Sequence, residues 1–199
     1  MARIVLFHSA YGLRPAVHAA AERLRAGGHE VTVPDLYDGR TTESVEAGMD
    51  IKDEIGADEL IRRAVKVAAG LGEGLVYAGF SLGASIAQNA VFADRAAAGL
   101  LMFHGTSDLR EDAATEVPVQ LHVAEPDPFE TEDWLGTWYL GMRRAGADVE
   151  IHRYRGAGHL FTDADLADYD REAAERAWAI ASDFLSEIDA AAAAASDPG

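Results

Sequence analysis

The chain has 199 residues, a length that predicts one globular domain. It carries 17 lysines and arginines against 34 aspartates and glutamates, a formal net charge of −17. Most of its surface therefore repels polyanions, and we expect neither nucleic acid nor a membrane as a partner. Because cysteine is absent, disulfides, thiolate metal sites and a cysteine nucleophile are excluded. The apolar run Ile4–Phe7 is too short for a signal peptide or a membrane span, so we expect a cytoplasmic protein.

Short apolar runs alternate along the chain with longer segments of helical period. The predicted strands are Ile4–His8, Glu30–Pro34, Leu75–Ala78, Leu100–His104, Val119–Val123 and Val149–Tyr154. The predicted helices are Arg14–Ala26, Ala57–Leu71, Leu82–Ala93, Thr131–Ala145 and Asp165–Ile188. This alternation predicts an α/β fold with a mainly parallel sheet of about six or seven strands and helices on both faces. Ligands of such sheets bind beyond the carboxyl ends of the strands.

Two segments fall outside this alternation. Tyr37–Ile55 is long, acidic and weakly periodic, and we interpret it as a flap beside the site. Residues 190–199 are mostly alanines followed by Ser-Asp-Pro-Gly, which predicts a fraying helix end and a flexible tail. We therefore expect a single domain over residues 1–189.

The motif Gly79-Phe80-Ser81-Leu82-Gly83 stands between a predicted strand and a predicted helix. A tight strand-to-helix turn presents its central side chain above the sheet, and glycines two positions away let neighbouring backbone pass. Ser81 is therefore the candidate nucleophile. A structural turn that happens to contain serine is the alternative.

Serine needs a base, because its hydroxyl is a weak nucleophile at neutral pH. Of the seven histidines, His159 lies in the glycine-rich loop Gly156–Phe161, directly after the last predicted strand. It is the candidate base, with a loop histidine of no catalytic role as the alternative. The others are interpreted as surface or structural residues: His8, His18, His29, His104, His122 and His152.

An acid should orient that imidazole and stabilise its charged form. Asp127, between two prolines after the strand Val119–Val123, is our choice, and Glu125 and Asp108 are the alternatives. The order serine, acid, histidine along the chain is the order that α/β-hydrolases use.

An oxyanion hole needs two backbone N–H donors. Leu82, directly after the nucleophile, is one candidate, and Ala10 in the loop after the first strand is the other. Candidate substrate-binding residues are Ser9, Tyr11, Tyr37 and Phe129.

Together these segments resemble the dienelactone hydrolase family of α/β-hydrolases over nearly the whole chain. The resemblance lies in Ile4–Gly12, Val33–Tyr37 (Val-Pro-Asp-Leu-Tyr), Gly79–Gly83, His122–Phe129 and Gly156–Phe161. It supports Asp127 over Glu125 as the acid, and it implies a compact hydrolase with no separate lid domain and no cofactor. We also expect no metal site, because the sequence has no His-Glu-x-x-His motif and no clustered histidine spacing.

Three positions depart from the family pattern. Ser81 replaces the usual cysteine, Ser9 replaces a glutamate, and Asp163 stands about where an arginine grips a substrate carboxylate. An anion in place of that cation favours a small uncharged substrate. We therefore expect a serine hydrolase that acts on a carboxylic ester or lactone through an acyl-serine intermediate. The alternatives are an acyltransferase or thioesterase with the same three residues, or a non-catalytic ligand-binding protein. The sequence leaves monomer or homodimer open.

Overall fold

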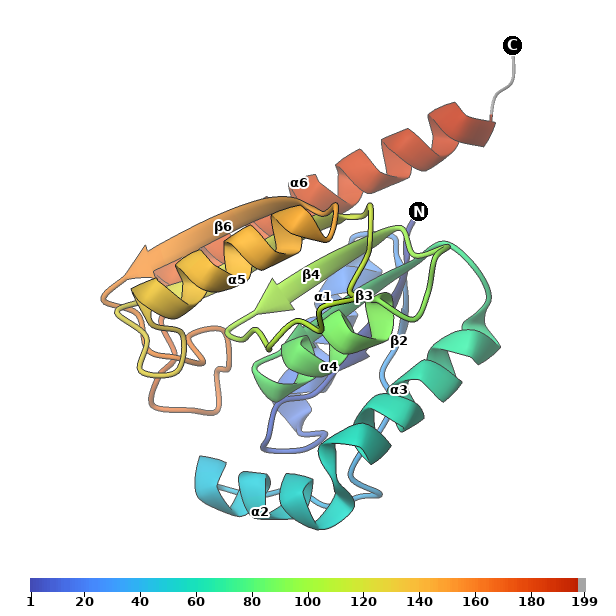
Figure 1. Ribbon diagram of the computed structural model, residues 1–199. Helices are drawn as coiled ribbons and strands as arrows, with labels where there is room; N and C mark the ends of the chain where they lie inside the picture. The colour runs from blue at the N-terminus through green and yellow to red at the C-terminus, as the bar shows by residue number, and fades with distance from the viewer. Residues whose placement is uncertain (197–199) are drawn as a thin grey trace.

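The protein is a three-layer α/β structure around one parallel sheet (Figure 1). A computed structural model describes residues 1–196. The six strands of the sheet are all parallel and follow the order β2-β1-β3-β4-β5-β6. This is the α/β-hydrolase-like architecture that the sequence predicts, and residues 1–196 include no separate lid domain.

The elements follow the predicted alternation closely. The strands are β1 (Arg3–Phe7), β2 (Glu30–Thr32), β3 (Leu75–Phe80), β4 (Gly99–Phe103), β5 (Pro118–Glu125) and β6 (Asp148–Arg155). The helices are α1 (Pro15–Ala26), α2 (Val45–Ile55), α3 (Ala57–Leu71), α4 (Leu82–Val91), α5 (Glu132–Arg144) and α6 (Arg171–Ser196).

The two faces of the sheet bury different sets of side chains, because successive strand residues point to opposite sides. Val5 and Phe7 of β1 pack with α3, α4 and α5, whereas Ile4 and Leu6 pack with α1 and α6. Both faces are thus covered by helices, as parallel sheets require. Because both faces are covered, the candidate site lies at the ends of the strands.

Helix α2 is missing from the sequence prediction, which treats Tyr37–Ile55 as an irregular flap. The structure folds its second half into α2, with the Ser44 side chain capping the amide of Ala47. The weak periodicity has a physical reason: Ile51 and Ile55 are only partly buried against the core, and Met49 stays exposed. The segment packs on the loop after β1 through Gly48, which lies against the Ala10 carbonyl.

Helix α6 differs from the prediction at both ends. It begins at Arg171 instead of Asp165, because Asp170 caps it by accepting from the amide of Ala173. It continues past Ile188 to Ser196 and extends beyond the sheet in Figure 1, because alanine has a high helix propensity. Residues 190–196 of the predicted tail are therefore helical, and residues 197–199 lie outside the described part of the chain.

The first turn of α4 packs directly on the end of β1. A side-chain carbon at Gly83 would overlap the backbone carbonyls of Phe7 and His8, and one at Gly79 would overlap the backbone of Gly83. Only glycine allows this close approach. Two backbone segments are therefore brought together at the strand end where Ser81 lies.

Replacing Gly83 by alanine should lower the free energy of unfolding by about 2–3 kcal/mol, because a methyl group would push α4 away from β1. The matched control is Gly136→Ala in α5, where nothing lies near the added carbon. It should stabilise the protein by about 0.5–1 kcal/mol. Urea unfolding of both variants measures these changes, and equal stabilities would contradict the packing argument.

Candidate active site

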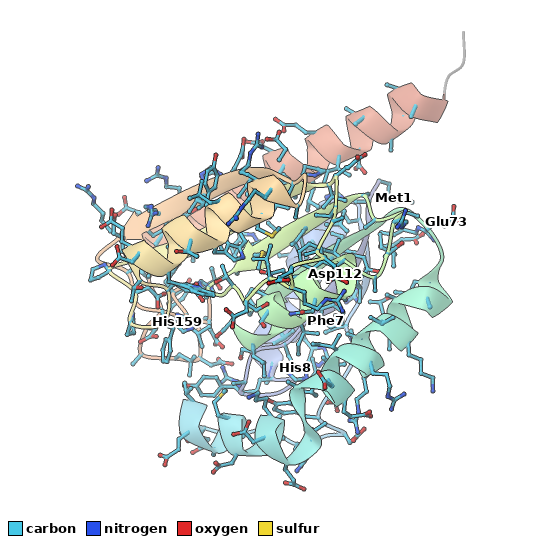
Figure 2. All side chains as sticks on the ribbon, viewed as in Figure 1. Met1, Phe7, His8, Glu73, Asp112 and His159 are labelled. Atoms are coloured by element: carbon cyan, nitrogen blue, oxygen red, sulfur yellow. The ribbon has the colours of Figure 1, made fainter. Side chains whose placement is uncertain are left out.

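The loops that follow the strands meet at one edge of the sheet. Figure 2 shows His8 and His159 toward this edge, with Met1 and Glu73 at the opposite end of the molecule. Ser81 follows β3, Asp127 follows β5 and His159 follows β6. These three residues are brought together at the carboxyl edge of the sheet.

Ser81 occupies a strained turn between β3 and α4. Its backbone has φ 50° and ψ −112°, a region that residues with side chains rarely adopt. The conformation is held from both sides: the Ser81 amide donates to the Phe103 carbonyl of β4 at 2.7 Å, and the Ser81 carbonyl accepts from the amides of Ala84 and Ser85. The side chain is thereby aimed away from the sheet, toward His159.

A hydrogen-bonded chain joins Ser81, His159 and Asp127. The Ser81 Oγ lies 3.0 Å from the His159 Nε2, and the His159 Nδ1 lies 2.8 Å and 3.0 Å from the two Asp127 carboxylate oxygens. Because a carboxylate only accepts, the Nδ1–H donates to it, and Nε2 is left to accept the proton of the hydroxyl. Asp127 and His159 are both buried, which keeps water from competing for these bonds.

Backbone bonds hold the two partners of Ser81 in place. The Asp127 Oδ1 accepts from the amides of Phe129 at 2.9 Å and Glu130 at 3.3 Å, so the aspartate closes its own turn. The loop that carries His159 is tied down where the Leu160 amide donates to the Asp168 carboxylate at 3.2 Å. Glu125, the alternative acid, instead pairs with Arg155 at 2.9 Å.

The two predicted oxyanion donors lie in segments that touch. Leu82 begins α4, where the first amides have no partner within the helix, and they carry the positive end of its dipole. Ala10 lies in the loop after β1. At the start of this loop, the carbonyls of Phe7 and His8 face Gly83 of α4. Ala10 is buried beneath α2, which fixes the position of this loop.

The predicted substrate-binding residues separate into two groups. The exposed Phe129 ring lies 4.6 Å from the His159 ring, centre to centre. Tyr11 and Ser9 belong to the loop after β1, which packs on the turn between β3 and α4. Tyr37 is 0% exposed, with its hydroxyl donating to the Gly48 carbonyl. Its side chain therefore supports α2 and presents no surface to a substrate, which corrects the expectation for this residue.

A cation beside the Tyr11 ring is paired. Arg14, which follows the loop after β1, forms an ion pair with Asp163, and both side chains are less than 15% exposed. The guanidinium also lies 4.6 Å from the centre of the Tyr11 ring. Burial raises the pKa of the Asp163 carboxyl, while the hydrogen bond from the Asp165 amide and the charge of Arg14 act against that shift. Asp163 also lines a small cavity of about 20 Å³ that Ser9, Phe80 and Leu160 share.

The histidines in or directly after β4, β5 and β6 lie near one another, and His104 and His122 are buried while His152 is half-buried. His122 of β5 stacks between Phe103 and His152 on the neighbouring strands and bonds the Tyr154 hydroxyl at 2.8 Å. Burial, with a smaller contribution from His152, lowers its pKa to about 3. His104 is also buried, and burial lowers its pKa well below the usual value.

Glu130 is a buried residue of the site that the sequence does not predict. Glu130 is only 7% exposed, and its carboxylate accepts from the Thr106 amide at 2.9 Å and from the Thr106 hydroxyl at 2.6 Å. The Trp134 indole donates to both residues. Glu130 stands in an acidic stretch that reads as solvent-exposed, and no local signal marks it as buried.

Side chains that could bind a metal ion were compared over the described part of the chain. Within residues 1–196, no three histidines, aspartates or glutamates are grouped so that they could hold a metal ion. In the same range, no helix has the length and apolar character needed to cross a bilayer.

Comparison with known proteins identifies the family of the chain. The model of the dienelactone hydrolase family matches residues 1–189. The chain belongs to the dienelactone hydrolase family. No curated protein gives a sequence match.

Three solved structures illustrate how widely this family member's fold is shared. A dienelactone hydrolase-like promiscuous phosphotriesterase from metagenomic libraries has a TM-score of 0.83 and 20% identity, over 94% of this chain and 87% of that chain. A protein named m3DLH has a TM-score of 0.80 and 23% identity, over 94% and 86%. A thermophilic esterase from the planctomycete Thermogutta terrifontis has a TM-score of 0.66 and 20% identity, over 94% and 81%. At these identities the likeness concerns the fold.

The His122 cluster predicts how stability depends on pH. In the unfolded chain the His122 imidazole binds a proton near pH 6.5, but in the folded chain it does so only near pH 3. Protonation of His122 between these pH values therefore favours unfolding. His122 alone should therefore remove about 1.4 kcal/mol of unfolding free energy for each unit that the pH falls through this window. Urea unfolding at several pH values measures the slope. The slope should become less steep by the His122 contribution in His122→Asn and stay unchanged in His18→Gln, because His18 is an exposed histidine. Equal slopes in wild type and His122→Asn would refute the assignment.

Proposed function

We propose that this member of the dienelactone hydrolase family is a serine hydrolase of small uncharged carboxylic esters or lactones. The observation that carries the proposal is the hydrogen-bonded chain from the Ser81 Oγ through the His159 imidazole to the Asp127 carboxylate. Such a chain supplies a nucleophile, a base and a group that stabilises the charged base. These are the parts that acyl transfer to serine requires.

In this mechanism, the Ser81 oxygen attacks the acyl carbon while the His159 Nε2 takes the hydroxyl proton. Asp127 keeps Nδ1 protonated and stabilises the imidazolium. The proton passes from Nε2 to the leaving alkoxide, and an acyl-serine remains. His159 then takes a proton from water, the hydroxide attacks the acyl carbon, and Ser81 leaves with that proton as the acid is released.

The negative charge on the carbonyl oxygen needs donors that are in place before the reaction. The Leu82 and Ala10 amides are the proposed pair, supported by the position of Leu82 at the start of α4 and by the packing of the Ala10 loop on Gly83 and Gly48. Each donor should lower the barrier by about 3–4 kcal/mol.

The preference for an uncharged substrate is supported by charge. The Arg14 guanidinium is neutralised by Asp163, so it offers no free cation to a substrate carboxylate. The net charge of −17 also disfavours the approach of anions. The exposed Phe129 ring against His159 supplies an apolar surface for an acyl or alkyl group.

Replacing Ser81 by alanine should reduce hydrolysis of p-nitrophenyl esters by at least about 10⁴-fold, because no other group can form the acyl intermediate. A fluorophosphonate probe should label Ser81 in the wild-type protein. Ser85→Ala is the matched control, since Ser85 lies in the first turn of α4, four residues after Ser81, and should not be needed for turnover.

Unchanged turnover in folded Ser81→Ala would refute the assignment of the nucleophile. A folded wild-type protein that is neither labelled nor active would favour the non-catalytic alternative. Transfer of the acyl group to an added alcohol or thiol, in preference to water, would favour an acyltransferase.

Replacing Asp163 by asparagine should change substrate preference by releasing the Arg14 charge. A freed guanidinium contributes about 1.5–3 kcal/mol to binding a carboxylate. The ratio of kcat/KM for p-nitrophenyl hydrogen succinate to that for p-nitrophenyl butyrate should therefore rise about tenfold or more. The exposed Asp165→Asn variant removes the same charge without freeing Arg14, so it should leave the ratio near the wild-type value. An equal change in both variants would contradict the role of the ion pair.

A further inference from the structure

His104, directly after β4, is a buried histidine that takes no part in the proposed mechanism. Its side chain is completely buried, and its backbone has φ 66°, a left-handed conformation that is uncommon for residues with side chains. Within residues 1–196, its Nδ1 is a buried nitrogen that has no hydrogen-bond partner. Both the strained backbone and the unpartnered nitrogen cost folding free energy. Packing alone therefore does not explain a histidine at this position.

The other ring nitrogen of His104 contacts the loop that carries the base. The His104 Nε2 lies 2.6 Å from the Thr162 Oγ1, and Thr162 stands three residues after His159 in the loop between β6 and α6. The ring also stands edge-on to the rings of Phe161 at 4.5 Å and His159 at 6.2 Å, centre to centre. One side chain of β4 thus holds the His159 loop by a hydrogen bond and by ring packing.

The direction of this hydrogen bond follows from the state of the ring. Burial lowers the pKa of His104 well below its usual value, so the ring is neutral and carries a single N–H. An orphaned N–H is rarer in protein interiors than an orphaned acceptor. Because Nδ1 has no partner, the hydrogen lies on Nε2, and His104 donates it to the Thr162 hydroxyl.

The residues on either side of His104 hold the backbone of the nucleophile. The Phe103 carbonyl accepts from the Ser81 amide at 2.7 Å, and a side-chain carbon at Gly105 would press on the Ser81 backbone. Residues 103–105 therefore contact the Ser81 turn through their backbone and the His159 loop through the His104 side chain. The end of β4 joins the two segments whose spacing sets the hydrogen bond between Ser81 and His159.

We propose that His104 is a positioning residue that holds the His159 loop against the Ser81 turn through its hydrogen bond to the Thr162 hydroxyl. For its effect on turnover this rests on the proposed function. The bond places the His159 Nε2 against the Ser81 Oγ, so its loss should lower kcat much more than it raises KM. A neutral side chain that keeps the donor should be sufficient, because His104 exchanges no proton in the reaction.

Two pairs of variants separate the hydrogen bond from the size of the side chains. Thr162→Val keeps the shape of threonine without its hydroxyl, whereas Thr162→Ser keeps the hydroxyl. His104→Leu removes both ring nitrogens, whereas His104→Gln supplies an amide N–H in place of the Nε2–H. With p-nitrophenyl butyrate, kcat should fall about 10–100-fold in Thr162→Val and His104→Leu. It should stay within about threefold of wild type in Thr162→Ser and His104→Gln.

The double variant and a distant control show whether the losses come from one bond. Thr162→Val combined with His104→Leu should be no slower than the slower single variant, because both changes break the same contact. Tyr77→Phe removes another hydrogen bond of the interior, from the Tyr77 hydroxyl to Asp94 at 2.9 Å, beyond the far end of α4. It should leave kcat near the wild-type value. Losses that multiply in the double variant would overturn the proposal, as would equal losses in Thr162→Val and Thr162→Ser.

Amide hydrogen exchange gives a readout that does not depend on activity. In the His159 loop, the Leu160 amide donates to Asp168 and the Asp163 amide donates to the Leu160 carbonyl. Both amides should exchange about 3–10-fold faster in Thr162→Val than in Thr162→Ser. Equal exchange in the two folded variants would overturn the proposal, even if kcat fell.

The same measurements distinguish this proposal from the proposed function. The expected exchange in a wild-type protein without esterase activity would leave the positioning role standing and refute the proposed function instead. An active wild-type protein whose kcat is unchanged in Thr162→Val would refute the positioning role alone. If His104→Leu does not fold, the two Thr162 variants decide the outcome.

Discussion

The close approach of backbone segments at the turn between β3 and α4 is the constraint on which the rest of the site depends. The first turn of α4 rests on the end of β1, and Gly105 rests on Ser81, with no room for a side chain at Gly79, Gly83 or Gly105. This packing holds Ser81 at a positive φ that an isolated chain would leave. Burial of the surrounding core compensates for the strain. The strain in turn aims the hydroxyl at His159.

Parallel strands extend this local constraint to the whole edge of the sheet. Because β3, β5 and β6 all run in the same direction, their carboxyl ends deliver Ser81, Asp127 and His159 to one place, although 78 positions separate the first and the last. The helices on both faces hold the strands in register. Helix α2 then covers the loop of Ala10, so the segment between β2 and α3 contributes support to the candidate site.

The charge of the whole surface differs from the charge in the immediate surroundings of the candidate site. The surface is strongly acidic as a whole, while Arg14 close to the site is neutralised by Asp163 within the protein. The buried Asp127 carboxylate lies 2.8 Å from the His159 Nδ1, where it stabilises the imidazolium that the proposed mechanism forms. The chain thereby disfavours anionic ligands and yet supports a cationic intermediate state of its base.

The sequence by itself determined the order of the elements and the loops in which chemistry is to be sought. Strand and helix periods are local, and a glycine motif or a histidine loop after a strand can be recognised without contacts. Only the tertiary structure decided that Glu130 is buried, that Tyr37 is sealed under α2, and that Arg14 pairs with Asp163. These three outcomes depend on partners far away in the chain, and a single sequence contains no local signal for such partners. The helical fold of Val45–Ile55 was hidden for a similar reason, since its stability comes from Gly48 packing on a distant loop more than from its own apolar period.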